Sequence, residues 1–370
     1  MQRPVVQNHL ILMKFYPGKK SRSLLLGILV MIVFTFGCNI VKKESKTATL
    51  LKTENATQAD LIKEVNRFAR VDSMRAKVFV KFEDNSFAEF GMKESYRDAN
   101  GEIVVQRPGM ILLKVQVPVF GTDIAQMTSD GEKFRVAILN DGGSGKYKKF
   151  VKGTNKADYS ALQKTLSADE KGNGKDAKEQ VNAFANLRPQ HFTDAMLVRP
   201  IAESNVYTHS TIFQIEEDTT VNSKSPLRKV TRGYYLLDEF EKQADGMLKI
   251  SRRFWFDRVG LVRLARQQIF DAQGEIESNI VYGKEGKLTD TGNFANLPLQ
   301  VQVTRPKERY SMRLTYSDPE GVTIGNRFPE TAFVLQNSWN LEEVDLDQKL
   351  RDAIIDPSSQ LNRNSAARKQ

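Results

Sequence analysis

The sequence has few of the residues that build metal sites and disulfide frameworks. Its 370 residues include one cysteine and three histidines. A zinc site made of several cysteines and a disulfide network are therefore both excluded within one chain. Beyond the leader described next, only His191 and His209 remain, and they fall in different predicted elements. The sequence also lacks a Rossmann glycine pattern, a phosphate-binding loop and a nucleophile elbow. We therefore expect no metal, no cofactor and no catalytic residue, so that the protein is not an enzyme.

Acidic residues are absent from residues 1–37. An apolar run at 24–36 follows a basic segment, and this order is typical of a secretory signal peptide. The run is shorter than the about 20 apolar residues that a transmembrane helix needs. Removing the leader halves the formal net charge of +10, so we predict no nucleic-acid partner. The basic residues of the leader are Arg3, Lys14, Lys19, Lys20 and Arg22.

The single cysteine, Cys38, follows Gly37 directly after the apolar run. This arrangement resembles the lipobox of bacterial lipoproteins, which implies cleavage before Cys38 and attachment of acyl chains such as palmitate. More than one acyl chain gives stable membrane anchoring. Asn39 occupies the place where an Asp would imply retention at the inner membrane, so the resemblance implies the periplasmic face of the outer membrane. The alternatives are a buried structural cysteine and an uncleaved N-terminal anchor.

The rest of the chain changes from a helical to a strand period. Residues 38–56 are polar without periodicity and are expected to form a tether. Leu61, Val65 and Phe68 then recur at helical spacing, after a possible capping box formed by Thr57 and Asp60. From residue 73 the period becomes two, as in a half-buried antiparallel strand. Further strands are expected at 88–96, 102–107, 110–117, 123–129, 133–139, 206–216, 228–238, 247–256, 261–270, 275–283, 298–305, 310–317 and 331–336.

A loop-rich segment near 140–200 interrupts the strands and is expected to be a helical insertion, with helices near 157–166, 175–186 and 190–197. Its lysines could contact anionic lipid headgroups, or they could form a solvated loop. A C-terminal helix is expected at 341–354, within a final segment 341–370 that ends in a disordered tail. The lysines in question are Lys146, Lys148, Lys149, Lys152 and Lys156.

Phe254, Trp255 and Phe256 are consecutive in a predicted strand. The two phenylalanines share one face and the tryptophan takes the other, so both faces are apolar. Ordinary core packing explains this pattern, and so does a hydrophobic cavity that accepts an acyl chain. The expected inward-facing cavity lining consists of Ile111, Leu113, Val115, Phe134, Phe254 and Phe256.

The order of these elements resembles the LolA/LolB-like fold of outer-membrane lipoprotein-sorting carriers. The resemblance implies a mainly β domain over residues 57–340, an antiparallel unclosed β half-barrel covered by helices and carrying the helical insertion. It further implies that the domain binds lipid or lipoprotein acyl chains. Local sequence that resembles the family lies at Ser73–Val78, Pro118–Gly121, Ser129–Phe134, Phe256–Leu261 and Leu297–Val301.

Two functions follow from these expectations. The first is a cell-envelope lipoprotein that binds or transfers a hydrophobic ligand, either lipid or a lipoprotein acyl chain. The second is a structural or assembly lipoprotein of the outer membrane whose cavity is filled by its own side chains. A well-packed interior favours the second function, and an apolar cavity favours the first.

Overall fold

The computed structural model describes residues 47–84, 94–116, 122–140, 145, 148–159, 190–285 and 297–355. The predicted leader, Cys38, the segment 160–189 and the tail after residue 355 lie outside these residues. Within them, no helix is both long and apolar enough to cross a membrane.

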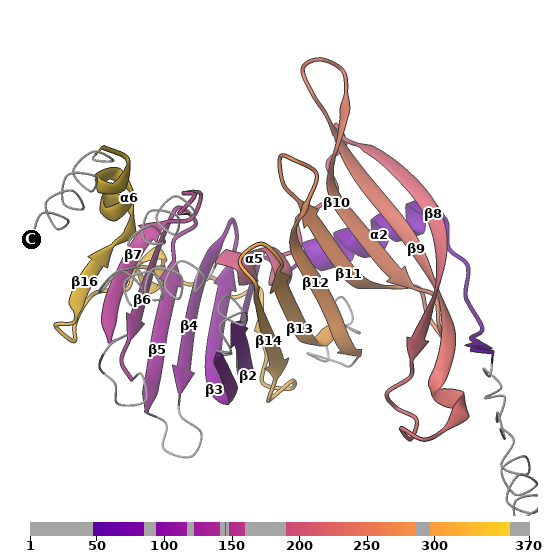
Figure 1. The fold of residues 1–370 in the computed structure, drawn as a ribbon, viewed down its shortest axis with the longest axis horizontal. Coiled ribbons are helices and arrows are strands. Elements are labelled where there is room, and N and C mark those ends of the chain that lie inside the picture. Colours follow the sequence, from indigo (N-terminus) through magenta and orange to yellow (C-terminus); the bar gives the residue numbers. More distant parts are fainter. Residues whose placement is uncertain are drawn as a thin grey trace, which may run out of the picture. The chain divides into compact units, whose positions relative to one another are not determined.

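The strands form one sheet (Figure 1). Its order is β1-β9-β10-β11-β12-β13-β14-β2-β3-β4-β5-β6-β7-β16, with β8 paired to β9 and β15 paired to β2. The bounds are β1 (Thr49–Leu50), β2 (Ser73–Asp84), β3 (Glu94–Gln106), β4 (Met110–Gln116), β5 (Asp123–Ser129), β6 (Lys133–Ile138), β7 (Lys149–Thr154), β8 (Val206–Glu217), β9 (Lys229–Lys242), β10 (Leu248–Asp257), β11 (Arg263–Phe270), β12 (Ile276–Glu285), β13 (Pro298–Arg305), β14 (Tyr310–Tyr316), β15 (Thr323–Ile324) and β16 (Glu342–Asp345).

The sheet does not close on itself among the described strands, as the sequence predicted. It is nevertheless mixed, because β1 pairs parallel with β9 and β16 pairs parallel with β7. Both parallel strands lie near the ends of the described chain. β1 lies beside β9, which pairs antiparallel with β10, and β16 lies beside β7, which pairs antiparallel with β6. The expectation of a wholly antiparallel sheet is therefore wrong at these two places.

One face of the sheet carries the core. On β2 the residues Ala76, Val78, Val80 and Phe82 are all buried, and the register continues this row into neighbouring strands. The buried side chains form one continuous apolar cluster from β9 to β7. The opposite face, called the outer face below, carries mostly polar side chains. The period-two pattern thus predicted correctly which residues of this strand are buried.

In the described part of the chain, three α-helices and two 3-10 turns accompany the sheet, namely α2 (Gln58–Ala69), α5 (Gln190–Met196), α6 (Leu346–Ile355), η2 (Pro226–Arg228) and η4 (Glu330–Phe333). The predicted capping box of α2 is present, with Thr57 and Asp60 bonded reciprocally. α2 packs against β11, and the short α5 contacts β3, β4 and β13. A continuous helical layer over the core face, as the sequence predicted, is not evident among the described residues.

Several predicted boundaries are wrong. Residues 98–101 lie between the strands expected at 88–96 and 102–107, but they continue strand β3. A Cβ on Gly101 would lie 2.9 Å from the Lys114 carbonyl oxygen and 3.1 Å from a Val80 methyl group. The glycine therefore serves close strand packing, which composition alone cannot separate from a turn. The expected strand at 331–336 is the 3-10 turn η4.

The two chain segments expected to be independent of the sheet are paired with it. Residues 47–56, part of the predicted tether, contain β1, and the Leu51 amide donates to Thr231. The predicted helix 341–354 is divided into β16 and α6. Within the expected helical insertion, residues 149–154 form β7 and residues 190–196 form the predicted last helix. Its other expected helices lie mainly outside the described residues.

Candidate ligand-binding site

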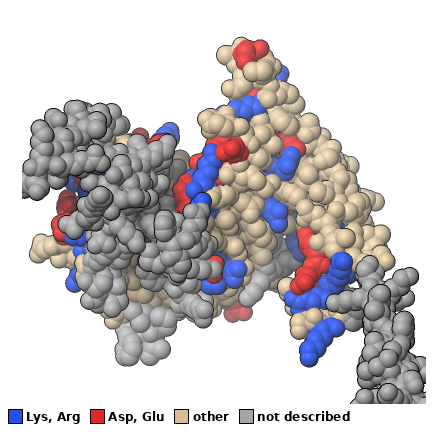
Figure 2. Space-filling view, in the orientation of Figure 1, with Lys and Arg blue, Asp and Glu red and all other residues tan. Residues whose placement is uncertain are grey.

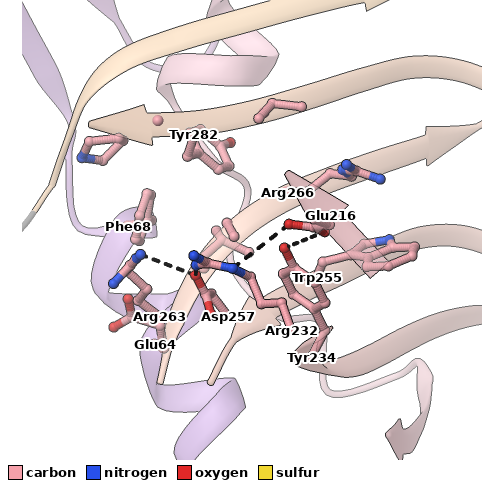
Figure 3. A pocket seen from close by; sticks show the side chains of 15 residues that line it. Glu64, Phe68, Glu216, Arg232, Tyr234, Trp255, Asp257, Arg263, Arg266 and Tyr282 are labelled. Carbon is pink, nitrogen blue, oxygen red and sulfur yellow. Dashed lines mark hydrogen bonds and ion pairs between the residues drawn. The ribbon is translucent and has the colours of Figure 1, made fainter. Parts of the chain in front are cut away.

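A cavity of about 350 Å³ lies where β11 and β12 separate. The pairing of these strands begins only at Arg266 opposite Val281, although β11 itself begins at Arg263. The cavity receives side chains from the outer face, from α2 and from the core face, and Figure 3 shows this arrangement. We call it the window; it is lined by Glu64, Phe68, Glu216, Arg232, Tyr234, Trp255, Asp257, Arg263, Leu264, Ala265, Arg266, Val281, Tyr282, Gly283 and Pro298.

Buried charge organises the outer side of the window. The Asp257 carboxylate is 4% exposed and pairs with the guanidinium groups of Arg232 and Arg263. Glu216 accepts a hydrogen bond of 2.8 Å from the Tyr234 hydroxyl. Burial acts to lower the pKa of Arg232, but the charge of Asp257 and the hydrogen bond to it prevail and raise that pKa. Burial and donation to Glu216 raise the pKa of Tyr234, so this hydroxyl keeps its proton at neutral pH.

One cation in the window lacks a carboxylate partner. The Arg266 guanidinium stacks 4.9 Å above the Trp255 ring and makes no ion pair with the described residues. The indole is fixed because its N–H donates to Gln268 at 2.9 Å, and the Tyr234 ring meets it edge-on. A guanidinium that stacks on an aromatic ring keeps its N–H donors available, because they point outward in the plane of the guanidinium group itself. This arrangement suits an anionic or strongly polar group.

The inner side of the window is apolar. The rings of Phe68 on α2 and Tyr282 on β12 lie 5.4 Å apart, and the Tyr282 hydroxyl donates to the Ala195 carbonyl on α5. Behind them, beneath α2 and α5, is a cavity of about 20 Å³. The two cavities share Phe68, Tyr282 and Pro298 as walls. The inner space has room for about one water molecule. Its other lining residues are Val71, Met74, Ala195, Met196, Leu297, Val301 and Tyr316.

The six residues predicted to line a cavity are all buried within the single core cluster, and none lines the window or the inner cavity. On β10 the predicted alternation is present, because Phe254 and Phe256 are fully buried while Trp255 lies on the other face. Sequence reasoning therefore missed Trp255 and Arg266. The only feature of the sequence that pointed to this site was the apolar residue on the outer face of β10. Nothing in the sequence shows where β11 and β12 separate. The six residues are Ile111, Leu113, Val115, Phe134, Phe254 and Phe256.

Polar groups also occur on the core face itself. Arg252 and Glu239 form an ion pair whose side chains are 4% and 2% exposed. The Arg252 guanidinium also donates to the carbonyls of Arg199 and Pro200, and Glu239 accepts from Asn205 and Tyr207. This network fixes residues 199–207 to the sheet. Closer to the window, Gln267 on β11 is 1% exposed and its Oε1 has no hydrogen-bond partner among the described residues.

The remaining candidates from the sequence have local partners. His191 contacts the Tyr310 hydroxyl, and His209 lies edge-on to the Tyr235 ring. Among the described residues, no group of three or more metal-ligating side chains occurs. Lys149 pairs with Glu342, and Lys152 pairs with Glu343 at 3.1 Å, so these two lysines join β7 to β16. The lipid-contacting role considered for the lysine cluster is therefore less suited to these two members.

No protein-family model matches the chain, and comparison with curated proteins gives no match. Among solved structures, a LolA superfamily protein from Nitrosomonas europaea matches with 11% identity and a TM-score of 0.36, covering 76% of this chain and 99% of that one. A DUF1329 family protein from Desulfovibrio piger matches with 10% identity and a TM-score of 0.35, covering 74% and 95%. A Vibrio parahaemolyticus domain described as outer-membrane lipoprotein-sorting matches with 9% identity and a TM-score of 0.35, covering 74% and 94%.

Two of these proteins carry names from the family that the sequence resembles, namely a LolA superfamily protein and a lipoprotein-sorting domain. With TM-scores below 0.5, they carry no information about the ligand or the partners of this chain.

Proposed function

We propose that the protein is a cell-envelope lipoprotein that binds or transfers an amphiphilic ligand, either a lipid or a lipoprotein acyl chain. The window takes the polar head of the ligand, and the apolar space beneath α2 and α5 takes its tail. The observation that carries this proposal is that the polar window and the inner apolar cavity share three walls. In the proposed protein, Cys38 carries the acyl anchor and the domain lies on the periplasmic side of the outer membrane.

Each part of the site suits one part of such a ligand. Arg266 offers free donors to a phosphate or carboxylate head, and Phe68 and Tyr282 offer rings to the first methylene groups. Burial of the tail contributes about 0.8 kcal/mol per methylene group, so binding needs no catalytic residue.

The inner cavity holds only about 20 Å³, so the tail enters by displacing α2 or α5 from the sheet. α2 is suited to this movement because it is 12 residues long and packs through a single buried stripe of Leu61, Val65 and Phe68. α5 has only seven residues. The bound state therefore exchanges contacts between helix and sheet for contacts between tail and sheet, with a similar apolar area buried in both.

The test is native mass spectrometry and organic extraction of the purified chain, followed by titration with a fluorescent fatty acid. The variant Gly283→Val narrows the window: a Cβ there comes no closer than 3.5 Å to its neighbours, so the backbone tolerates it. We expect fatty-acid affinity to fall by about tenfold, which corresponds to about 1.4 kcal/mol. Thr304→Val places the same side chain on β13 outside the window and should leave affinity unchanged. Absence of co-purifying lipid, together with absence of fatty-acid binding, contradicts the proposal.

The second candidate function is an assembly lipoprotein without a ligand. The burial of the expected cavity lining favours it, because all six residues belong to one cluster of buried apolar side chains. This alternative predicts that the chain purifies without lipid and captures defined partner proteins after cross-linking in intact cells.

A further inference from the structure

Exposed apolar side chains are concentrated at one end of the sheet. This is the end of β8–β11 at which β1 attaches, and we call it the β1 end; it comprises residues 49–55, 213–233 and 257–263. Five of the nine large hydrophobic side chains that are exposed in the described chain lie there. Their exposed fractions are 65% for Leu50, 53% for Phe213, 63% for Ile215, 62% for Leu227 and 52% for Leu261.

Strand register aligns part of this surface. Leu50 on β1 and Ile215 on β8 are both paired with Thr231 on β9, one from each side. Directly paired residues point to the same face of a sheet, so Leu50, Thr231 and Ile215 form one row. Phe213 lies two residues from Ile215 and therefore on the same face. Its ring lies against Gly233, where a Cβ would come within 3.0 Å of it. The row is thus a fixed apolar surface.

Basic residues accompany the apolar ones at this end. Lys224 and Lys229 are exposed and form no ion pair with the described residues, and the Lys52 side chain is 90% exposed although its ammonium lies 3.6 Å from Glu54. In Figure 2, Lys and Arg side chains lie beside Asp and Glu side chains at the lower right of the view, over the β8–β9 part of this end. Proteins that bind a membrane surface combine apolar side chains, which enter the boundary between headgroups and acyl chains, with basic side chains, which contact anionic headgroups.

Two further observations identify a bilayer as the occupant. The described chain starts at Thr47, two residues before β1, and the nine residues from Cys38 span at most about 30 Å when extended. A lipid anchor on Cys38 therefore keeps the β1 end near the membrane. The window opens at the same end, since Arg232, Asp257 and Arg263 belong to both.

We propose that the β1 end is a membrane-docking surface: Leu50, Phe213, Ile215, Leu227 and Leu261 enter the headgroup–acyl boundary of the bilayer and bring the window to the lipid surface. This inference rests on the proposed lipid anchor. In this orientation a ligand passes between the bilayer and the window without crossing open water.

The experiment compares two hairpin positions with nearly equal exposure. Leu227→Cys lies at the β1 end, whereas Met247→Cys lies at the opposite tip, between β9 and β10, with 66% exposure. Each variant of the full chain is purified with its acyl group, labelled with an environment-sensitive fluorophore, and reconstituted into vesicles of phosphatidylethanolamine and phosphatidylglycerol. We expect a blue shift at position 227 and quenching by spin-labelled lipid, with neither effect at position 247.

Equal emission and no quenching at both positions would overturn the proposal. A blue shift at position 227 that appears without vesicles and grows with protein concentration would also overturn it, because a second copy then covers the surface. Mass spectrometry of the N-terminus separates these failures from failure of the proposed function. An unmodified Cys38 contradicts the lipid anchor, and because its free thiol would also take up the fluorophore, the two labels are then placed in a Cys38→Ser background.

Discussion

At the scale of single residues, Arg252 and Glu239 show how charge is kept inside an apolar face. Burial acts to raise the pKa of Glu239, but the hydrogen bond and the charge of Arg252 prevail and lower it, so the carboxylate stays ionised. Asn205 and Tyr207 donate further hydrogen bonds to the same carboxylate. Every charged atom of the pair thus has a partner, which is the condition under which a buried ion pair is tolerated.

We therefore predict that Arg252→Met is strongly destabilising. It leaves the Glu239 charge buried without its cation, and breaking such a pair typically costs about 3–5 kcal/mol. The double variant Arg252→Met with Glu239→Leu should recover much of that loss, because neither charge remains. Urea unfolding of the three proteins checks this. A loss below about 1 kcal/mol in the single variant would mean that water reaches the pair.

At the scale of elements, the sequence predicted best where one local pattern is sufficient. α2 was predictable because a capping box and an apolar stripe coincide within 12 residues. The segment 341–354 was also expected to be a helix, yet residues 342–345 form β16. This strand pairs with β7, and Glu342 and Glu343 form ion pairs with Lys149 and Lys152, which are 193 and 191 positions away in the sequence. The window was likewise unpredictable, because it depends on where β11 loses its pairing with β12. Long-range strand pairing overrides local propensity at both places.

The contact between α6 and β7 should depend on pH. Asp347 on α6 accepts hydrogen bonds from the Thr154 hydroxyl at 2.7 Å and from the Tyr159 hydroxyl. Burial acts to raise the pKa of Asp347, but these hydrogen bonds prevail and lower it below the ordinary value of 3.8. A lowered folded-state pKa gives stability that is complete above about pH 4 and is lost as the pH falls through the folded value. We expect the protection factors of amides in β7 and β16, which compare the observed exchange rate with the intrinsic rate at the same pH, to fall below pH 4. In Asp347→Asn, these protection factors should already be lower at neutral pH and should depend less on acid.

At the scale of the whole molecule, a carrier and a scaffold differ in what occupies the core face. A scaffold needs its apolar cluster filled permanently by its own side chains. In a carrier, side chains of the protein fill the same space when no ligand is bound, and the ligand displaces some of them when it binds. In the described chain the inner cavity, at about 20 Å³, has no room for a tail, as the first requirement demands of this part of the cluster. The second requirement is met in part, because only α2 and α5 among the described helices pack on this face near the window.

Phe68→Ala distinguishes the two, because its effects on stability and on binding should have opposite signs. Phe68 is 6% exposed and separates the window from the inner cavity, so its removal joins the two spaces. Deleting a buried phenylalanine ring costs about 3–5 kcal/mol of stability. In a carrier the joined cavity should nevertheless bind fluorescent fatty acid more tightly than the parent chain does, because the tail no longer has to displace the ring. Phe79→Ala, at a side chain 45% exposed on β2, is the control and should change neither quantity much. Thermal unfolding and fatty-acid titration give both readings on one sample. A loss of stability without any gain in binding would favour the scaffold.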